Sequence, residues 1–270
     1  HTLGGVVAGH LTNMKNAADP FAVEAGVRAA LLADKGYTGS VEVFEGKEGL
    51  FEVFDKIKWD KDILVKGLGD NFLINQCGYK AFPTEALTHQ PITAALEVMQ
   101  ENHLNPQEVK EIIVETTTRG ADILSDPSKY KPTTKETADH SLPYCIAVAV
   151  AKGNVLPSDF KEEALRDSLV WSLLDKIKVL ANPEIDSLFP KIKRAIVSIK
   201  TPKGIFKKQE DFAKGQPERP LSDEDVDSKF KANSEKEISF AKMKEIIKAT
   251  QELEKIDNIE DYMSLLIRDK

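Results

Sequence analysis

Apolar residues recur at helical spacing in several parts of this chain, and each such segment is predicted to form a helix. These segments are residues 19–32, 91–99, 141–151, 168–179, 240–254 and 259–267. Asp19 is the expected N-cap of the first helix, with Pro20 at its first position and Gly36 just beyond its end. Residues 141–151 are almost wholly apolar, so that helix should be buried on every side.

Two shorter segments are predicted to form strands. Residues 111–118 combine isoleucine and valine with β-branched threonines, and residues 195–199 lead into a turn at 201–204. Polar stretches with glycine or proline at 66–71 and 212–220 are predicted connections. The strands therefore fall in the middle of the chain, and both flanks are helical.

This distribution predicts a mixed α and β protein in which an α+β segment is inserted into a helical domain. We expect residues 1–75 to form part of the helical domain and residues 76–212 to form the α+β domain. Residues 213–270 should return to the helical domain. The glycine- and alanine-rich start of the sequence has no helix start signal, so we expect the chain to be a fragment or a processed half.

Composition and charge exclude several classes of protein. Hydrophobic residues make up 41% and charged residues 30% of the chain, which is ordinary for a globular protein. A formal charge of −7 gives no general attraction for nucleic acid or an anionic membrane. The given sequence has no apolar run long enough to span a bilayer and no basic segment followed by an apolar one at its start, so we expect a protein that is neither membrane-spanning nor secreted. Two cysteines cannot build a disulfide framework, so we expect a reducing, cytoplasmic location.

The common cofactor and catalytic signatures are missing from the sequence. There is no P-loop, no GxSxG nucleophile motif and no HExxH zinc motif. The five histidines lack the spacing of metal ligands. We therefore expect no metal and no cofactor, and a chemistry performed by ordinary side chains.

Several polar residues are placed unusually and are candidates for such chemistry. Lys80 and His89 bracket a loop that leads into the helix at 91–99, where they could converge on an anion. His140 follows Asp139 at the start of the apolar helix, as a catalytic group or as a capping or core histidine. Lys15 precedes the first helix and could equally be a solvated lysine.

Ordered motifs along the chain resemble those of the 2-methylcitrate dehydratase/cis-aconitate decarboxylase family (MmgE/PrpD). They are AALLA at 29–33 with GYTG at 36–39, GLGDNF at 67–72 with KAFP at 80–83, ETADHSLPY at 136–144, and GQP at 215–217 with PLS at 220–222 and KF at 229–230. The similarity spans essentially the whole sequence, but it is to the later part of family members. The resemblance implies a helical domain with an inserted α+β lid domain, and a site in the cleft between them.

The resemblance also implies which residues act. The family's active-site lysine falls at Lys15, and catalytic histidines fall at or near His89 and His140. The lysine of the lid loop falls at Lys80 and a polar position of that loop at Glu85, both implied to bind substrate. These cations and imidazoles would stabilise the anionic transition state that forms when a proton is removed beside a carboxylate.

Two departures from the family pattern bear on the activity. Ala121 stands where decarboxylase members carry a tyrosine after the lid strand, which favours dehydration over decarboxylation. Further acidic and histidine groups of the family belong to a part that precedes this sequence. We therefore expect little turnover from the 270-residue chain alone.

The leading hypothesis is a cofactor-free hydro-lyase that dehydrates 2-methylcitrate or a related 2-hydroxy tricarboxylate. A cis-aconitate-type decarboxylase or a dicarboxylate epimerase of the same fold is the alternative, because fold alone does not choose between them. A non-catalytic C-terminal subunit of a split enzyme, which pairs with an N-terminal half, is a further alternative. The resemblance also implies a homodimer through helical segments, and the abundant alanine and glycine in the first 32 residues are suited to close packing.

Overall fold

The computed structural model describes residues 11–53, 60, 62 and 65–268 of the chain. By its internal contacts the chain divides into two units, and each is described here by itself. Residues 1–6 and 12–77 belong to the first unit, and residues 7–11 and 78–270 belong to the second. Within the described residues, no helix is both long enough and apolar enough to cross a bilayer.

The first unit is built around one long helix. The short 3-10 helix η1 (Asn13–Ala17) runs directly into α1 (Ala18–Asp34), followed by α2 (Leu50–Val53) and the 3-10 helix η3 (Leu73–Gln76). The helix predicted at 19–32 is confirmed, but Asp19 is not its N-cap. Ala17 holds that position without a side-chain bond, because η1 already supplies helical backbone ahead of Asp19.

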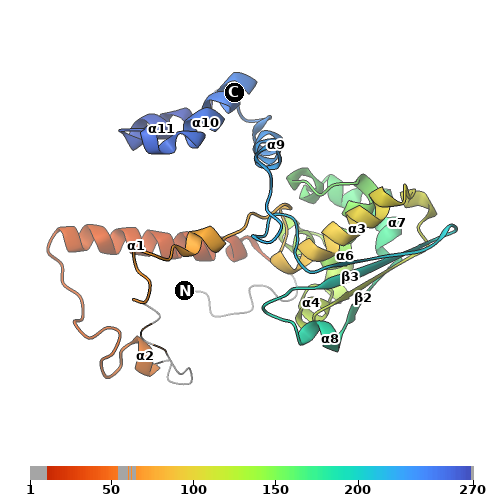
Figure 1. Cartoon of the computed structure of the whole chain (residues 1–270), viewed down its shortest axis with the longest axis horizontal. Helices are drawn as coiled ribbons and strands as arrows, with labels where there is room; N and C mark the ends of the chain where they lie inside the picture. The colour runs from red at the N-terminus through yellow and green to blue at the C-terminus, as the bar shows by residue number, and fades with distance from the viewer. Residues whose placement is uncertain (1–10, 54–59, 61, 63–64, 269–270) are drawn as a thin grey trace. The chain divides into compact units, whose positions relative to one another are not determined.

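The second unit contains a four-stranded sheet with the order β2-β1-β3-β4. Its strands are β1 (Glu111–Thr116), β2 (Ile177–Ala181), β3 (Ala195–Thr201) and β4 (Gly204–Glu210). β1 pairs in parallel with β2 and antiparallel with β3, so that Ile112 lies opposite both Ile177 and Ile199. These three isoleucines are buried, and Figure 1 shows helices α3 and α6 beside the strands.

Two strands differ from the sequence prediction. The helix predicted at 168–179 ends early, as α7 (Ser168–Leu174), and the chain then extends into β2. Pairing with β1 overrides the local helical periodicity there, since β-sheet structure depends strongly on tertiary context. At residues 204–210, where β4 lies, the sequence predicted no strand. β4 is an edge strand whose residues are exposed or only partly buried, so its sequence carries little hydrophobic signal.

Short helices complete the second unit around the sheet. The α-helices are α3 (His89–Glu101), α4 (Thr118–Ile123), α5 (Lys135–Ala138), α6 (Leu142–Lys152) and α8 (Pro183–Asp186). The 3-10 helices are η4 (Ala86–Thr88), η5 (Pro106–Glu108), η6 (Pro127–Tyr130), η7 (Pro157–Phe160) and η8 (Ala164–Arg166). Helix α3 packs on β3 and β4, and α6 packs on α3, α7 and β2.

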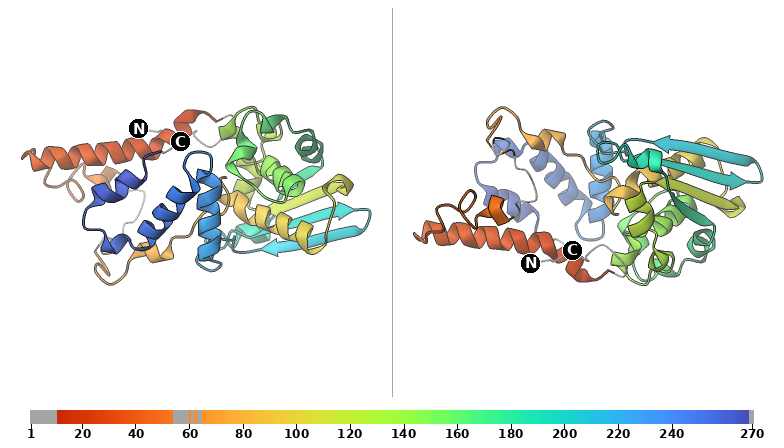
Figure 2. Two further views of the ribbon diagram at one scale, coloured as in Figure 1. Left: turned by 90° about the horizontal axis from the view of Figure 1, so that it is seen from above. Right: turned by 90° about the horizontal axis from the view of Figure 1, so that it is seen from below.

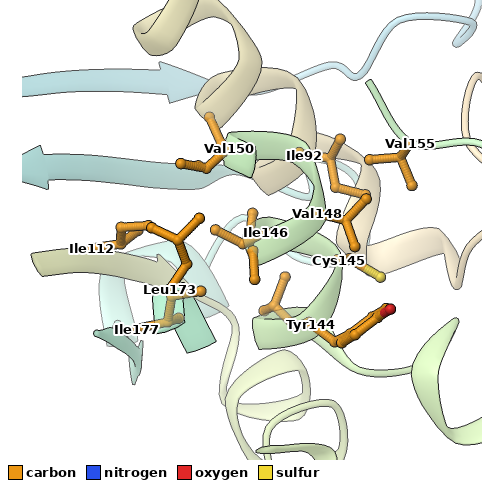
Figure 3. Close-up of a cluster of buried hydrophobic side chains, with 14 of the residues drawn as sticks. Ile92, Ile112, Tyr144, Cys145, Ile146, Val148, Val150, Val155, Leu173 and Ile177 are labelled. Atoms are coloured by element: carbon orange, nitrogen blue, oxygen red, sulfur yellow. The ribbon is translucent and has the colours of Figure 1, made fainter. Parts of the chain in front are cut away.

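Helix α6 lies at the centre of this core, as its apolar sequence predicted. Every residue from Leu142 to Val150 is buried. In Figure 3 its side chains lie between Ile112 of β1, Leu173 of α7 and Ile92 of α3. The Ser141 hydroxyl accepts the Tyr144 N–H at one end, and Gly153 adopts a left-handed conformation at the other.

The last part of the chain is helical, as predicted. It contains α9 (Asp223–Ser234), α10 (Phe240–Gln251), the 3-10 helix η9 (Leu253–Lys255) and α11 (Ile259–Leu265), which Figure 2 shows in blue. A small cluster of Ile238, Met243 and Ile246 holds these helices together. The prediction of a mixed α and β protein is confirmed, while the division at residues 75 and 212 stays a prediction.

Candidate functional site

The loop before α3 carries two of the candidate residues. The Lys80 ammonium donates a hydrogen bond to the backbone carbonyl oxygen of Thr84, at 2.9 Å. His89 begins α3, is 5% exposed, and its Nε2 lies 3.4 Å from the same carbonyl oxygen. Lys80 and His89 thus meet at one backbone atom, the Thr84 carbonyl oxygen, and their convergence on an anion stays a prediction.

The environment of His89 favours a neutral imidazole. Its pKa is lowered to about 4, mainly by burial and also by the positive charges of three nearby lysines, against the opposing bond to Thr84. These lysines are Lys80, Lys193 and Lys229. At neutral pH the ring is uncharged and surrounded by fixed cations, which is an arrangement suited to a polyanionic ligand.

Glu85 joins this loop to a second candidate segment. Its carboxylate accepts the Leu87 N–H at 2.5 Å and so caps η4. Its own N–H donates to the backbone carbonyl oxygen of Asp139, at 3.0 Å. Glu85 therefore brings the loop of Lys80 and the segment of His140 side by side, and its role in binding substrate stays a prediction.

His140 lies just before the N-cap of α6 and is held by a carboxylate. Its Nδ1 is 2.5 Å from Oδ1 of Asp139, and the other oxygen of that carboxylate accepts a hydrogen bond from Lys135 at 2.9 Å. Both Asp139 and His140 are 8% exposed. Because a carboxylate oxygen accepts, Nδ1 carries the proton, and Nε2 of a neutral ring is left with its lone pair.

This arrangement can perform proton transfer. His140 has the geometry of a general base whose tautomer is set by a carboxylate, the same logic that orients histidines in other catalytic sites. Lys80 and Lys193, two of the lysines around His89, could hold carboxylate groups and stabilise negative charge that develops on them. A base and a cluster of cations are the two requirements for removing a proton beside a carboxylate.

The structure adds two residues that sequence reasoning missed. Lys229 of α9 donates a hydrogen bond to the backbone carbonyl oxygen of Lys80, 149 positions away in the sequence. The KF motif at 229–230 marks this residue, but the sequence could not show its contact with Lys80. Lys135 lies four residues before Asp139, a spacing that does predict a pair on a helix. Lys15 lies on η1 of the first unit, and its place in the site stays a prediction.

The two cysteines add no candidate group to this site. Burial raises the pKa of the Cys145 thiol well above its usual value, so it behaves as a small apolar side chain of α6. Cys77 is exposed in the first unit. Among the described residues, no three His, Cys, Asp or Glu side chains gather as they would around a metal ion.

Comparison with known proteins gives a family and two relatives. Residues 82–254 match the model of the MmgE/PrpD C-terminal domain, and residues 3–61 match that of the MmgE/PrpD N-terminal domain. The human cis-aconitate decarboxylase is 25% identical over 91% of this chain and 51% of its own length. The mouse cis-aconitate decarboxylase is 24% identical over 97% of this chain and 54% of its own length. The chain thus spans about half the length of these curated relatives.

The buried neutral imidazole of His89 predicts a specific dependence of stability on pH. The unfolded chain binds a proton at this residue near pH 6.5, whereas the folded chain does so only near pH 4. The unfolded state therefore holds the extra proton in this window, and the free energy of unfolding falls as pH drops through it, by about 3 kcal/mol for His89. Urea unfolding between pH 4 and 7 should show this loss, reduced in a His89→Gln variant. His103→Asn, in the turn after α3, is the control, and equal slopes for the wild type and His89→Gln would contradict the assignment.

A second prediction concerns the tautomer of His140. In the wild type the ¹⁵N chemical shifts of this ring should show a protonated Nδ1 and an unprotonated Nε2, because Nδ1 donates to Asp139. Asp139→Asn should remove this preference, since an amide can present either a donor or an acceptor. Lys135→Met is the matched control, because it removes the other partner of Asp139 and leaves the bond to His140. A wild-type ring protonated on Nε2 would exclude His140 as the base proposed below.

Proposed function

This chain belongs to the MmgE/PrpD family, and from that premise we propose that it forms part of a cofactor-free lyase acting on a tricarboxylate. The leading reaction is dehydration of 2-methylcitrate or a related 2-hydroxy tricarboxylate to its cis-aconitate-type product. The observation that carries this proposal is the Asp139–His140 pair, joined through Glu85 to the lysine-lined loop of His89. We place the enzyme in the cytoplasm.

In the proposed reaction His140 removes a proton from the carbon beside a carboxylate. The C–H bond electrons form the new carbon–carbon double bond while the C–O bond of the adjacent carbon breaks. The departing hydroxide takes up a proton, in the overall balance the one that His140 removed, so water is the second product. The increase of negative charge on the carboxylate is the main obstacle, and a cation held nearby lowers it. We propose Lys80, one of the lysines whose charge acts on His89, for that role. We assign Lys15 and His89 to the same active site, and Glu85 to substrate binding.

Decarboxylation of cis-aconitate is the second candidate, favoured by the names of the two relatives. That reaction releases carbon dioxide and delivers a proton to carbon, so it uses the same type of acid and base. Against it stands Ala121, on α4 directly after β1, where the family resemblance places a tyrosine in decarboxylases. Epimerisation of a dicarboxylate would need the same proton transfer without loss of a group.

The proposed enzyme needs further chain for a complete site. The relatives are about twice as long as the matched region, so we propose that an N-terminal half supplies the remaining acid and base groups. That half would belong to the same polypeptide or to a partner. If it is a separate chain, this one is its C-terminal subunit.

We expect the enzyme purified from its source cells, with any polypeptide that co-purifies, to consume one of these substrates. NMR in D₂O separates the outcomes: loss of the methine proton and collapse of the methyl doublet to a singlet for dehydration of 2-methylcitrate, release of carbon dioxide seen by ¹³C NMR for decarboxylation, and deuterium exchange alone for epimerisation. His140→Asn in this enzyme should lower kcat by about 10²–10⁴-fold, the range of a lost general base. His103→Asn is the control. Equal turnover by His140→Asn and the wild type would reject the mechanism.

We also propose that the enzyme is a homodimer through its helical segments. Val23, Val27 and Leu31 lie four residues apart on α1 and are each more than half exposed, which forms an apolar stripe that a second copy could cover. Light scattering of the complete enzyme should then give twice the mass of one protomer, and Val27→Glu should lower it toward one. A monomer mass for the wild type at micromolar concentration would contradict the proposal.

A further inference from the structure

A cavity of about 400 Å³ lies in the second unit, and the Phe82 ring that lines it also packs against the His89 ring. Its walls come from the loop at residues 81–83, the loop at residues 154–157, the connection before α9, and α9 itself. The volume lies within the range of small-molecule sites in proteins. His89 and His140 do not line it, and no part of the proposed reaction uses it.

The charges in the wall select one kind of ligand. Lys214 and Lys229 line the cavity together with Asp225, and the Lys214 ammonium lies 2.6 Å from the Asp225 carboxylate. That pair neutralises itself, which leaves one net positive charge, on Lys229. A single carboxylate would balance this charge. A tricarboxylate would bring two uncompensated negative charges close to Asp225, at a cost that grows with desolvation.

The rest of the wall is apolar. Phe82 and Val155 are buried beneath it, while Leu156 is 38% exposed at its edge. Pro83, Pro157 and Leu221 extend the apolar surface between these residues. An exposed leucine beside two prolines would gain from contact with hydrocarbon, because each CH₂ group removed from water contributes roughly 0.8 kcal/mol.

We propose that this cavity binds a small monocarboxylate with an aliphatic body. Its carboxylate pairs with the Lys229 ammonium, which donates one hydrogen bond to the Lys80 carbonyl oxygen and has further N–H groups for a ligand. Its hydrocarbon part lies against Phe82, Val155 and Leu156. The site is distinct from the tricarboxylate site, and the proposal stands whether or not the proposed function is correct.

The cavity is connected to the loop of Lys80 and His89 by two direct contacts. Lys229 holds the Lys80 backbone carbonyl, and the Phe82 ring lies 5.5 Å, between centroids, from the His89 ring. A ligand that draws Lys229 toward its carboxylate and presses on Phe82 therefore changes the surroundings of His89. Binding in the cavity is expected to be visible at the His89 ring.

The experiment is an NMR titration of the isotope-labelled chain with hexanoate at constant ionic strength. Hexanoate should give saturable shifts at the backbone amides of Phe82, Val155 and Lys229 and at the His89 ring. 1-Hexanol has the same hydrocarbon length without the charge and should bind at least about tenfold more weakly, as expected for loss of a charge-assisted hydrogen bond. Cis-aconitate should not produce the same shifts.

Two variants separate the site from a general effect of charge or folding. Lys229→Met should weaken hexanoate binding by about tenfold or more, whereas Lys203→Met, in the turn between β3 and β4, should leave it unchanged. Ala232→Trp places a large ring in the cavity from the exposed face of α9 and should abolish binding without removing a charge. Ala241→Trp, at an exposed position of α10, is the control for the added ring. If Lys229→Met does not fold, Ala232→Trp still tests the site.

Three results would overturn the proposal. One is the lack of saturable shifts with hexanoate in the wild-type chain. Another is equal binding by wild type and Ala232→Trp, which would place the ligand elsewhere. The third is tighter binding of cis-aconitate at the same amides, which would make the cavity part of the tricarboxylate site.

Discussion

Complete burial of helix α6 is the constraint on which the second unit depends. From Leu142 to Val150 the helix offers no polar face to water, so other elements must surround it. Each fully buried isoleucine, valine or leucine contributes about 1.5–3 kcal/mol relative to exposure. The sheet covers it through β2, while α3 and α7 cover its other sides. The remaining helices and loops of the unit are placed around this one element.

Burial of α6 also fixes the backbone just before its N-terminus, where Asp139 and His140 lie. The Ser141 hydroxyl caps the helix and at the same time donates to the carbonyl oxygen of Lys129, 2.5 Å away. Lys129 itself is completely buried, with Asp126 3.3 Å from its ammonium, and a buried cation is costly unless it is paired. Asp139 and His140 precede this fixed turn, so their mutual orientation is set by the core rather than by a free loop.

The sequence predicted the parts of the fold that depend on local pattern. The positions of α1, α3, α6 and α10 followed from apolar spacing, and β1 and β3 from β-branched runs. It did not predict β2, where pairing with β1 outweighs a helical pattern, or β4, an edge strand with no strong apolar alternation. These errors share one cause, since strand formation depends on partners that are distant in the chain.

In the candidate site, too, the contacts that the sequence could not predict are those between residues far apart in the chain. The sequence could single out Asp139 and His140 as neighbours, and it could name Lys80 and His89 as candidates at the two ends of one loop, but not the backbone carbonyl that both contact. The contact of Lys229 with the Lys80 carbonyl oxygen could not be predicted, because the two residues are 149 positions apart in the sequence. In a chain with a net charge of −7, this gathering of lysines around one uncharged imidazole is a local property. Only the folded structure brings those cations together, and that is why composition alone excluded nucleic acid but could not locate an anion site.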